Sequence, residues 1–374
     1  MSSVKKVLVT GAKGFVGSNL VVALRRSGLE VAEIDVDSSA ADLAAGISGA
    51  GVVYHLAGVN RPENEAEFTT GNVGSIEAVV AEAGRMVSAP TIVLSSSAQA
   101  ELDNPYGRSK LAAERAVEKY AADGKRAAVI YRFPGIFGKW CRPNYNSVVA
   151  TFCHNIARDL PVAVSDPGRV LELVYVDDVV GQLMTHIASR TPGLSRASVA
   201  PVFRMTVRDL ERMIRAFRDM RASGEIADMS DPLTQRLLAA YTSYLPPVDL
   251  PYSLLQRTDA RGTLAELARS PRFGQIFVSR TRPGMTRGNH YHDMKVEKFC
   301  VLDGDAVIRF RSVRGKEVTE HRVSGSEFKV VDIPPGMTHS IENVGNTEMI
   351  VLFWASEMFD DKRPDTYVEE VVRG

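Results

Sequence analysis

The chain has 374 residues, 45% of them hydrophobic and 24% charged, a composition typical of a globular protein whose length exceeds what one hydrophobic core usually organises. Lysine plus arginine and aspartate plus glutamate each number 45, so no net positive field exists to recruit nucleic acid or an anionic membrane. The three cysteines, Cys141, Cys153 and Cys300, show no CxxC spacing and indicate a reducing compartment. Without an apolar run of membrane-spanning length or room for a signal peptide before the first expected strand, we expect a cytoplasmic protein of two domains.

The first part of the chain alternates short β-branched runs with amphipathic segments. We expect strands at 7–9, 52–57, 91–94 and 127–131, and helices at 14–26, 72–86 and 106–120. Strand and helix in strict alternation predict a doubly wound parallel sheet, an α/β fold of the Rossmann type.

The pattern becomes irregular beyond residue 222, and the proline-rich stretch TSYLPPVDLPY at 242–252 is typical of a connector. Short strands punctuated by glycine and proline are expected after it, at 273–281, 298–313, 328–336 and 349–355. Their spacing predicts an antiparallel barrel or all-β jelly roll. We therefore predict one domain at 1–247 and a second at 248–374.

Three glycines, Gly11, Gly14 and Gly17, lie between the first expected strand and the first expected helix. The first can form a tight turn, the second can admit a pyrophosphate to the backbone, and the third can let helix and sheet approach, with the helix N-terminus facing the phosphates. This arrangement predicts a dinucleotide site. Asp35 ends the next expected strand, where an acid binds the adenosine ribose, and it favours NAD because NADP requires a nearby arginine for its 2′-phosphate.

Tyr106 and Lys110 are four residues apart on an expected helix and therefore share a face. A tyrosine can protonate a carbonyl oxygen if a nearby ammonium stabilises its phenolate, and Lys110 is placed to do so. The run SSS at 95–97 follows an expected strand, and any of its hydroxyls can bind the same carbonyl oxygen.

The motifs TGAKGFVG, VYHLAG, GNV, LSSS, PYGRSK, YRFPGIFG and YVDDV resemble those of the extended short-chain dehydrogenase/reductases, in that family's order. The resemblance implies that Ser97 and Tyr106 are catalytic, that Lys110 binds the nicotinamide ribose and steadies Tyr106, and that Asn72 supports the proton relay. Only eight residues separate Ser97 from Tyr106, fewer than is usual in the family, so a more open site is expected. The cofactor-binding residues that the resemblance implies are Gly11, Gly14, Phe15, Val16, Gly17, Asp35, Leu56, Ala57, Asn72, Lys110 and Pro134.

The second part of the chain resembles the cupins. Residues 284–304 reproduce the pattern G(x)5HxH(x)4E(x)6G, and residues 334–343 reproduce PxGxxHxxxN. His290 and His292 alternate along an expected strand, so both rings can reach one ion, and Glu297 and His339 complete a set of three histidines and one carboxylate. These four residues predict a site for one divalent metal ion, with zinc the expected one.

A second resemblance assigns His290 another role. DARGTLAE at 259–266 and RGNHYH at 287–292 are similar to motifs of the dTDP-4-keto sugar epimerases, which use the histidine of RGxH as a base without a metal. The neighbouring ligands favour coordination, yet both readings indicate proton abstraction beside a ketone. Arg261 or Arg287 would bind phosphate or sugar oxygens.

With both domains in this order and stretches such as AGVNRPE and FGKWCRPNYNSV, the whole chain resembles the CapF/WbjC family of capsule and O-antigen synthesis enzymes. The resemblance implies two steps toward UDP-N-acetyl-L-fucosamine. The second domain would epimerise C3 of a UDP-2-acetamido-2,6-dideoxy-4-hexulose, and the first would reduce C4 to give UDP-2-acetamido-2,6-dideoxy-L-talose. NADPH is the cofactor that the family implies, with NADH left open by Asp35.

The expected partners are thus a UDP-linked 4-keto-6-deoxy-N-acetyl sugar and further copies of the chain in a homodimer or higher homo-oligomer, without nucleic acid or membrane. Two alternatives remain: a sugar-nucleotide reductase whose second domain only mediates dimerisation, and a non-catalytic dinucleotide sensor. The second would leave the set of Ser97, Tyr106 and Lys110 unexplained.

Overall fold

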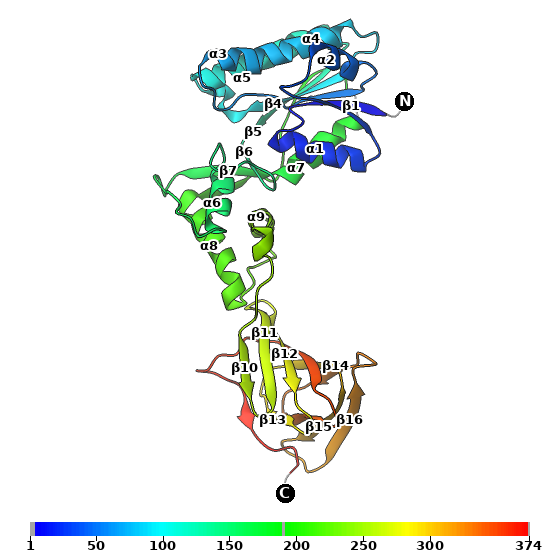
Figure 1. The fold of residues 1–374 in the computed structure, drawn as a ribbon, viewed down its shortest axis with the longest axis vertical. Coiled ribbons are helices and arrows are strands. Elements are labelled where there is room, and N and C mark those ends of the chain that lie inside the picture. Colours follow the sequence, from blue (N-terminus) through cyan, green and yellow to red (C-terminus); the bar gives the residue numbers. More distant parts are fainter. Residues whose placement is uncertain (1–3, 189–190, 373–374) are drawn as a thin grey trace. The chain divides into compact units, whose positions relative to one another are not determined.

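The structure is a computed structural model that describes residues 4–188 and 191–372, and it divides the chain into two compact units (Figure 1). The N-terminal unit comprises Met1–Arg215 and Gln235–Pro246, and the C-terminal unit comprises Ala216–Thr234 and Pro247–Gly374. A single cut at 247 therefore misses one segment. Residues 216–234 belong with the C-terminal unit because the Ile226 N–H donates to the Arg269 carbonyl (2.8 Å) and the Arg269 N–H donates to that of Gly224 (2.8 Å).

The N-terminal unit is built on a six-stranded parallel sheet. Its strands are, in order across the sheet, β2 (Glu30–Ile34), β1 (Lys6–Thr10), β3 (Val52–His55), β4 (Thr91–Ser97), β5 (Ala127–Phe133) and β8 (Gly193–Ala197). The order reverses between β1 and β3, so the carboxyl ends of these strands open the crevice in which α/β sheets of this kind bind ligands.

Helices cover both faces of this sheet because the apolar residues of its strands alternate between them (Figure 1). Val7 and Val9 of β1 pack on one side against α1 (Phe15–Arg26) and α7 (Val176–Met184). Leu8 packs on the other side. The helices of that side are α2 (Ala40–Ile47), α4 (Ser75–Arg85) and α5 (Pro105–Ala121). The Rossmann-type arrangement predicted from the sequence is confirmed.

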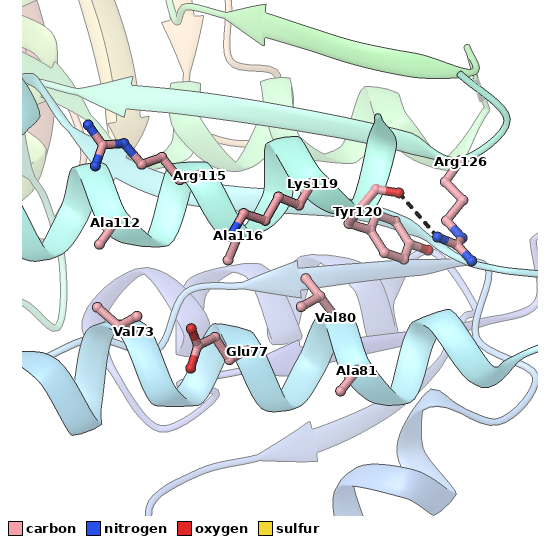
Figure 2. A pocket seen from close by; sticks show the side chains of 10 residues that line it. All are labelled: Val73, Glu77, Val80, Ala81, Ala112, Arg115, Ala116, Lys119, Tyr120 and Arg126. Carbon is pink, nitrogen blue, oxygen red and sulfur yellow. Dashed lines mark hydrogen bonds between the residues drawn. The ribbon is translucent and has the colours of Figure 1, made fainter. Parts of the chain in front are cut away.

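A groove runs over the surface of the N-terminal unit between α4 and α5 (Figure 2). Apolar side chains such as Val80 and Ala116 line it together with the charged Glu77, Arg115 and Lys119. The groove lies between helices rather than at the carboxyl edge of the sheet, and none of the predicted site residues line it.

Smaller elements complete this part of the chain. They are the three-stranded sheet of β6 (Gly135–Phe137), β7 (Val170–Tyr175) and β9 (Phe203–Thr206), with the helices α3 (Ala66–Phe68), α6 (Val148–Ile156), α8 (Val207–Ser223) and α9 (Pro232–Ser243). The expectation of irregular structure beyond residue 222 is wrong for α9. Pro232 occupies the first position of that helix, where a missing N–H costs nothing, so a residue that suggested a loop begins a helix instead.

The C-terminal unit consists mainly of two antiparallel sheets that enclose a common core. The larger sheet contains β10 (Gln256–Asp259), β11 (Gly262–Ser270), β12 (Gly274–Thr281), β19 (Met349–Ala355), β14 (Glu297–Asp303) and β17 (Val330–Ile333), in that order. The smaller sheet contains β16 (Val318–Ser324), β15 (Asp305–Ser312), β18 (Met337–Asn343), β13 (Thr286–Tyr291) and β20 (Tyr367–Val368).

Phe299 and Phe353 of the larger sheet meet Ile308, Phe310 and Ile341 of the smaller one in this core. Two antiparallel sheets packed face to face confirm the predicted jelly roll. Among residues 4–188 and 191–372, no helix combines the length and the apolar character that crossing a bilayer requires.

Candidate active sites

The glycine turn after β1 brings the chain against the end of β3. Gly11 has a φ of 66°, and a Cβ there would lie 2.7 Å from the Ala57 nitrogen, next to Leu56. A Cβ on Gly17 would lie 2.0 Å from the Gly11 carbonyl oxygen, so only glycine lets α1 pack this closely.

Gly14 precedes α1, and among the described residues no side chain caps the first N–H groups of the helix, to which Phe15 and Val16 belong. The open N-terminus of α1 is therefore free to bind phosphate oxygens.

Asp35 directly follows β2 and is already engaged. Its carboxylate accepts a hydrogen bond from the Lys13 backbone N–H (2.7 Å), while the Lys13 ammonium pairs with Asp37 at 2.6 Å. The structure thus places two carboxylates and one lysine where the second strand ends. Lys13 is the basic group that the sequence analysis overlooked, because it precedes Asp35 in the chain whereas an arginine was sought after it.

Tyr106 and Lys110 lie on one face of α5, and the lysine Nζ is 5.8 Å from the centroid of the tyrosine ring. Burial lowers the pKa of Lys110 to about 8, although the nearby Glu114 carboxylate partly opposes this shift. Burial also raises the pKa of Tyr106, while a hydrogen bond with Ser97 acts in the opposite direction. This geometry provides a proton donor, an adjacent cation and a hydroxyl in one cluster.

The three serines form the last residues of β4 instead of following the strand, and alternation therefore separates them. The Ser96 hydroxyl donates to the buried Glu114 carboxylate at 2.5 Å, and Arg132 binds the same carboxylate. The Ser96 hydroxyl is therefore held by a residue of α5 and is not free to bind a substrate. Of the three, Ser97 is the one that affects the pKa of Tyr106, and its hydroxyl also accepts the Gln99 N–H at 3.1 Å.

Asn72 connects the tyrosine helix to the loop after β3. It lies in a π-helical turn, Thr69–Gly74, and its side-chain amide donates to the Ser109 hydroxyl (2.9 Å) and to the Val59 carbonyl (3.1 Å). A Cβ on Gly58 would lie 2.9 Å from both the Asn72 Oδ1 and the Lys110 Nζ. Asn72 therefore holds the surroundings of Lys110 in place. Pro134, the last of the predicted cofactor residues, follows β5 at the same edge of the sheet.

The C-terminal unit brings together all four predicted metal ligands, which are His290, His292, Glu297 and His339. One ligand atom from each lies within 4.8 Å of the others. The Nε2 atoms of His292 and His339 lie 3.3 and 3.4 Å from the same Glu297 oxygen. Burial lowers the pKa of His290 to about 4, so its imidazole is neutral at pH 7, as a metal ligand requires.

Hydrogen bonds at the far sides of two rings decide their orientation. The Nδ1 of His292 lies 2.6 Å from the Asp365 carbonyl oxygen, and that of His339 lies 3.2 Å from the Met337 carbonyl oxygen. A carbonyl only accepts, so Nδ1 carries the proton and the Nε2 lone pair points toward Glu297. Both Nε2 atoms are buried without a hydrogen-bond partner among the described residues.

Imidazole lone pairs that point toward a carboxylate are repelled by its negative charge unless a cation lies between them, so the donor set fits a metal ion. Burial by itself raises the pKa of Glu297, and lowering it to about 2 requires positive charge on the imidazole side of the carboxylate. A cation held between these side chains would supply that charge.

Two features that the sequence analysis missed direct these side chains. The first is a bulge in β13, where Gly288 and Asn289 have φ values of 98° and 58° and the register shifts before His290. The second is Asp365, whose carboxylate accepts the N–H groups of Asp293 (2.9 Å), Met294 (3.0 Å) and Lys295 (2.8 Å) while its carbonyl binds His292. Asp365 lies outside both histidine-containing motifs of the sequence. Its distinguishing feature is a φ of 35°, which belongs to the tertiary structure.

The two arginines expected to bind substrate oxygens differ in their surroundings. Arg261 is paired with Asp259 at 2.6 Å. Arg287 lies opposite the core residue Ile341, so it faces the interior of the jelly roll, and its Nη2 is buried without a hydrogen-bond partner among the described residues. Arg287 is therefore the better placed of the two.

The two units match different families. Residues 7–194 match the NAD dependent epimerase/dehydratase family, and residues 257–367 match the polysaccharide biosynthesis C-terminal domain. Over 370 residues the chain is 40% identical to a UDP-2-acetamido-2,6-beta-L-arabino-hexul-4-ose reductase of Pseudomonas aeruginosa, covering 99% of this chain and 100% of that relative.

Solved structures point in the same direction. The capsular polysaccharide assembling protein CapF from Staphylococcus aureus superimposes with a TM-score of 0.90 at 42% identity, covering 98% of this chain and 100% of that chain. MoeE5, solved with UDP-glucuronic acid and NAD, has a TM-score of 0.51 at 25% identity, covering 56% of this chain and 81% of that chain. Family, fold and the open α1 N-terminus support an NAD(P) cofactor. The chain belongs to the NAD dependent epimerase/dehydratase family, among the CapF-type nucleotide-sugar reductases that carry a polysaccharide biosynthesis C-terminal domain.

Proposed function

We propose that the N-terminal unit reduces the C4 ketone of a UDP-2-acetamido-2,6-dideoxy-4-hexulose and yields UDP-2-acetamido-2,6-dideoxy-L-talose. The cluster of Ser97, Tyr106 and Lys110 is the observation that carries this proposal. Ser97 would bind the carbonyl oxygen, Tyr106 would protonate it as hydride arrives at C4, and the Lys110 ammonium would stabilise the resulting phenolate. The relative named UDP-2-acetamido-2,6-beta-L-arabino-hexul-4-ose reductase, which is matched over its full length, supports the choice of substrate.

NADPH is the cofactor that we propose, with NADH as the second choice. Lys13 contacts Asp35 through its backbone N–H, and its ammonium would bind a 2′-phosphate by leaving Asp37. Asp35 would bind the ribose hydroxyls of NADH equally well. Comparing the KM values for the two cofactors in the native protein and in Lys13→Gln tests this assignment. A change confined to NADPH supports it, and equal changes for both contradict it.

We further propose that the C-terminal unit epimerises C3 of the same sugar before reduction. His290, His292, Glu297 and His339 would hold one divalent cation, for which zinc suits the nitrogen-rich donor set. When bound, such a cation would supply Lewis-acid polarisation of a carbonyl. Arg287, buried and facing the interior, would bind an oxygen of the sugar or its phosphates. Removal of the C3 proton beside the ketone would also require a base.

The experiment is an NMR measurement of solvent deuterium exchange at C3 of the 4-keto sugar, with and without NADPH. Exchange without NADPH that is lost in His290→Ala would support catalysis by the C-terminal unit. Unchanged exchange in that variant would favour the alternative in which this unit only mediates assembly. The homo-oligomeric state remains a prediction, and sedimentation of the native protein measures it.

A further inference from the structure

Two parts of the sequence have no role in the reactions above, residues 60–63 of AGVNRPE and the stretch FGKWCRPNYNSV at 137–148. The first follows β3, and most of the second follows β6. The structure brings them together at one aromatic ring. The guanidinium carbon of Arg61 lies 5.7 Å from the centroid of the Tyr145 ring, and that of Arg142 lies 5.1 Å from it.

Both arginines are exposed, and within the described part of the chain neither forms an ion pair or a hydrogen bond. Lys139 in the same loop differs, because Asp177 accepts both of its contacts at 2.5 and 2.7 Å. Two unpaired like charges at one ring repel each other, and a bound anion would remove that repulsion.

The loop that carries Arg142 is held in place from several sides. The Tyr244 hydroxyl donates to the Cys141 carbonyl at 2.6 Å, and the Asn19 amide donates to the Lys139 carbonyl at 3.3 Å. Trp140 and Asn144 have positive φ values of 68° and 54°, which non-glycine residues rarely adopt. Backbone strain of this kind persists only where the surroundings enforce it, and it concentrates at ligand sites.

Asn19 and Asn72 connect the two segments that carry the arginines to the carboxyl edge of the parallel sheet. Asn19 lies early in α1 and also donates to the Phe15 carbonyl at 2.8 Å, beside the glycine turn. Asn72 donates to the Val59 carbonyl and accepts its N–H at 2.7 Å, which fixes the chain two residues before Arg61. The arginine pair is thus attached to the segments that surround Tyr106, while the α1 N-terminus is left for the cofactor.

We propose that Arg61 and Arg142, supported by the Tyr145 ring, bind the diphosphate of the nucleotide-sugar substrate. The assignment rests on the proposed reductase function and adds to it the residues that recognise the nucleoside diphosphate. A guanidinium donates two parallel N–H groups to phosphate oxygens, and an aromatic face keeps it oriented without neutralising its charge. The two arginines come from different loops, so a diphosphate joins the two segments.

The test compares the affinities for UDP, uridine and NADPH, measured by calorimetry, of the native protein and of Arg61→Gln and Arg142→Gln. We expect each substitution to weaken UDP binding roughly tenfold or more and to leave uridine and NADPH binding unchanged, because only the charge-assisted contacts to phosphate are lost. The loss should shrink as salt rises. Arg26→Gln is the matched control, since this exposed arginine lies in the last turn of α1, away from the carboxyl edge.

Each other outcome overturns the assignment and separates it from the proposed function. If native protein binds UDP and both variants bind it equally well, the diphosphate site lies elsewhere and the reductase proposal stands. If Arg26→Gln weakens UDP binding equally, the change in net charge alone explains the effect. If native protein binds NADPH but neither binds UDP nor reduces the 4-keto sugar, the proposed function fails and the assignment fails with it.

Discussion

Two clusters of buried polar side chains differ in how many of their atoms find hydrogen-bond partners within the chain. The N-terminal cluster lies around Tyr106 and Lys110, and the C-terminal cluster comprises His290, His292, Glu297 and His339. Around Tyr106 and Lys110, the buried polar groups bond to one another: Asn72 binds Ser109 and Val59, and Lys110 binds the Ser95 carbonyl at 3.3 Å. In the C-terminal cluster, two buried imidazole nitrogens face one carboxylate without a hydrogen-bond partner among the described residues.

This difference indicates which ligands each cluster requires. Buried polar atoms are nearly always hydrogen-bonded, so unpaired ones indicate a missing partner. The buried polar groups of the N-terminal cluster satisfy one another, so the proposed reductase site would need only cofactor and substrate. The C-terminal cluster is arranged around a position that a cation would fill.

Tyr106→Phe should have the largest effect, and that effect should be confined to the N-terminal cluster. Loss of the proton donor is expected to slow NADPH oxidation about 1,000-fold. NADPH binding and C3 deuterium exchange should persist. Tyr120→Phe is the matched control, because this tyrosine lies in the last turn of the same helix, where its hydroxyl donates to the Pro90 carbonyl at 2.7 Å. Loss of reduction and exchange together in Tyr106→Phe would contradict separate catalysis by the two units.

His339→Ala tests whether the C-terminal cluster holds a cation. We expect bound zinc, measured by elemental analysis of the purified protein, to fall close to zero, and the thermal transition of this unit to drop by several degrees because a ligand that binds only the folded state stabilises it. NADPH binding should not change. His321→Ala is the control, since this exposed histidine of β16 lies outside the cluster. Equal metal content in native protein and His339→Ala would refute a metal role for this residue.

Gly17→Ala should disrupt the N-terminal cluster through the backbone. A Cβ 2.0 Å from the Gly11 carbonyl oxygen forces α1 away from the turn, so we expect a loss of about 2–4 kcal/mol in unfolding free energy and weaker NADPH binding. Gly84→Ala in α4 meets nothing within 4 Å and should stabilise by about 0.5–1 kcal/mol. Denaturant titration measures both variants, and equal stability would show that the turn tolerates a side chain.

Asp365→Ala should loosen the C-terminal cluster without removing a ligand. The variant loses three hydrogen bonds from the loop 293–295, so we expect about 1–2 kcal/mol less stability and weaker zinc binding. Competition with a chromophoric chelator measures the zinc affinity. Asp361→Ala is a nearby exposed control. An unchanged zinc affinity in Asp365→Ala would show that the His292 orientation does not depend on this loop.

Glu114→Gln should have the smallest effect, a shift in the pH profile of the reductase. The Lys110 pKa of about 8 implies that kcat/KM for reduction falls as the pH rises through 8, because the ammonium then loses its proton. The Glu114 charge raises this pKa, so its removal should move the falling limb to lower pH. A limb that stays in place or moves to higher pH would exclude Lys110 as its origin.

The sequence by itself determined the fold class and the motif residues. Local periodicity specifies strand or helix, and the positions of Gly11 and Gly17 specify a turn that only glycine can form. His290, His292, Glu297 and His339 were recognisable because they match the two cupin motifs, and His290 and His292 alternate along one strand.

The tertiary structure alone decided which polar groups have partners. Ser96 is excluded because Glu114, eighteen positions away in the chain, takes its hydroxyl. Asp365 reaches His292 and Arg61 meets Tyr145 across long stretches of chain that carry no periodic signal. Hydrogen-bond satisfaction and charge pairing depend on distances of a few ångströms between remote segments, and a linear pattern does not encode those distances.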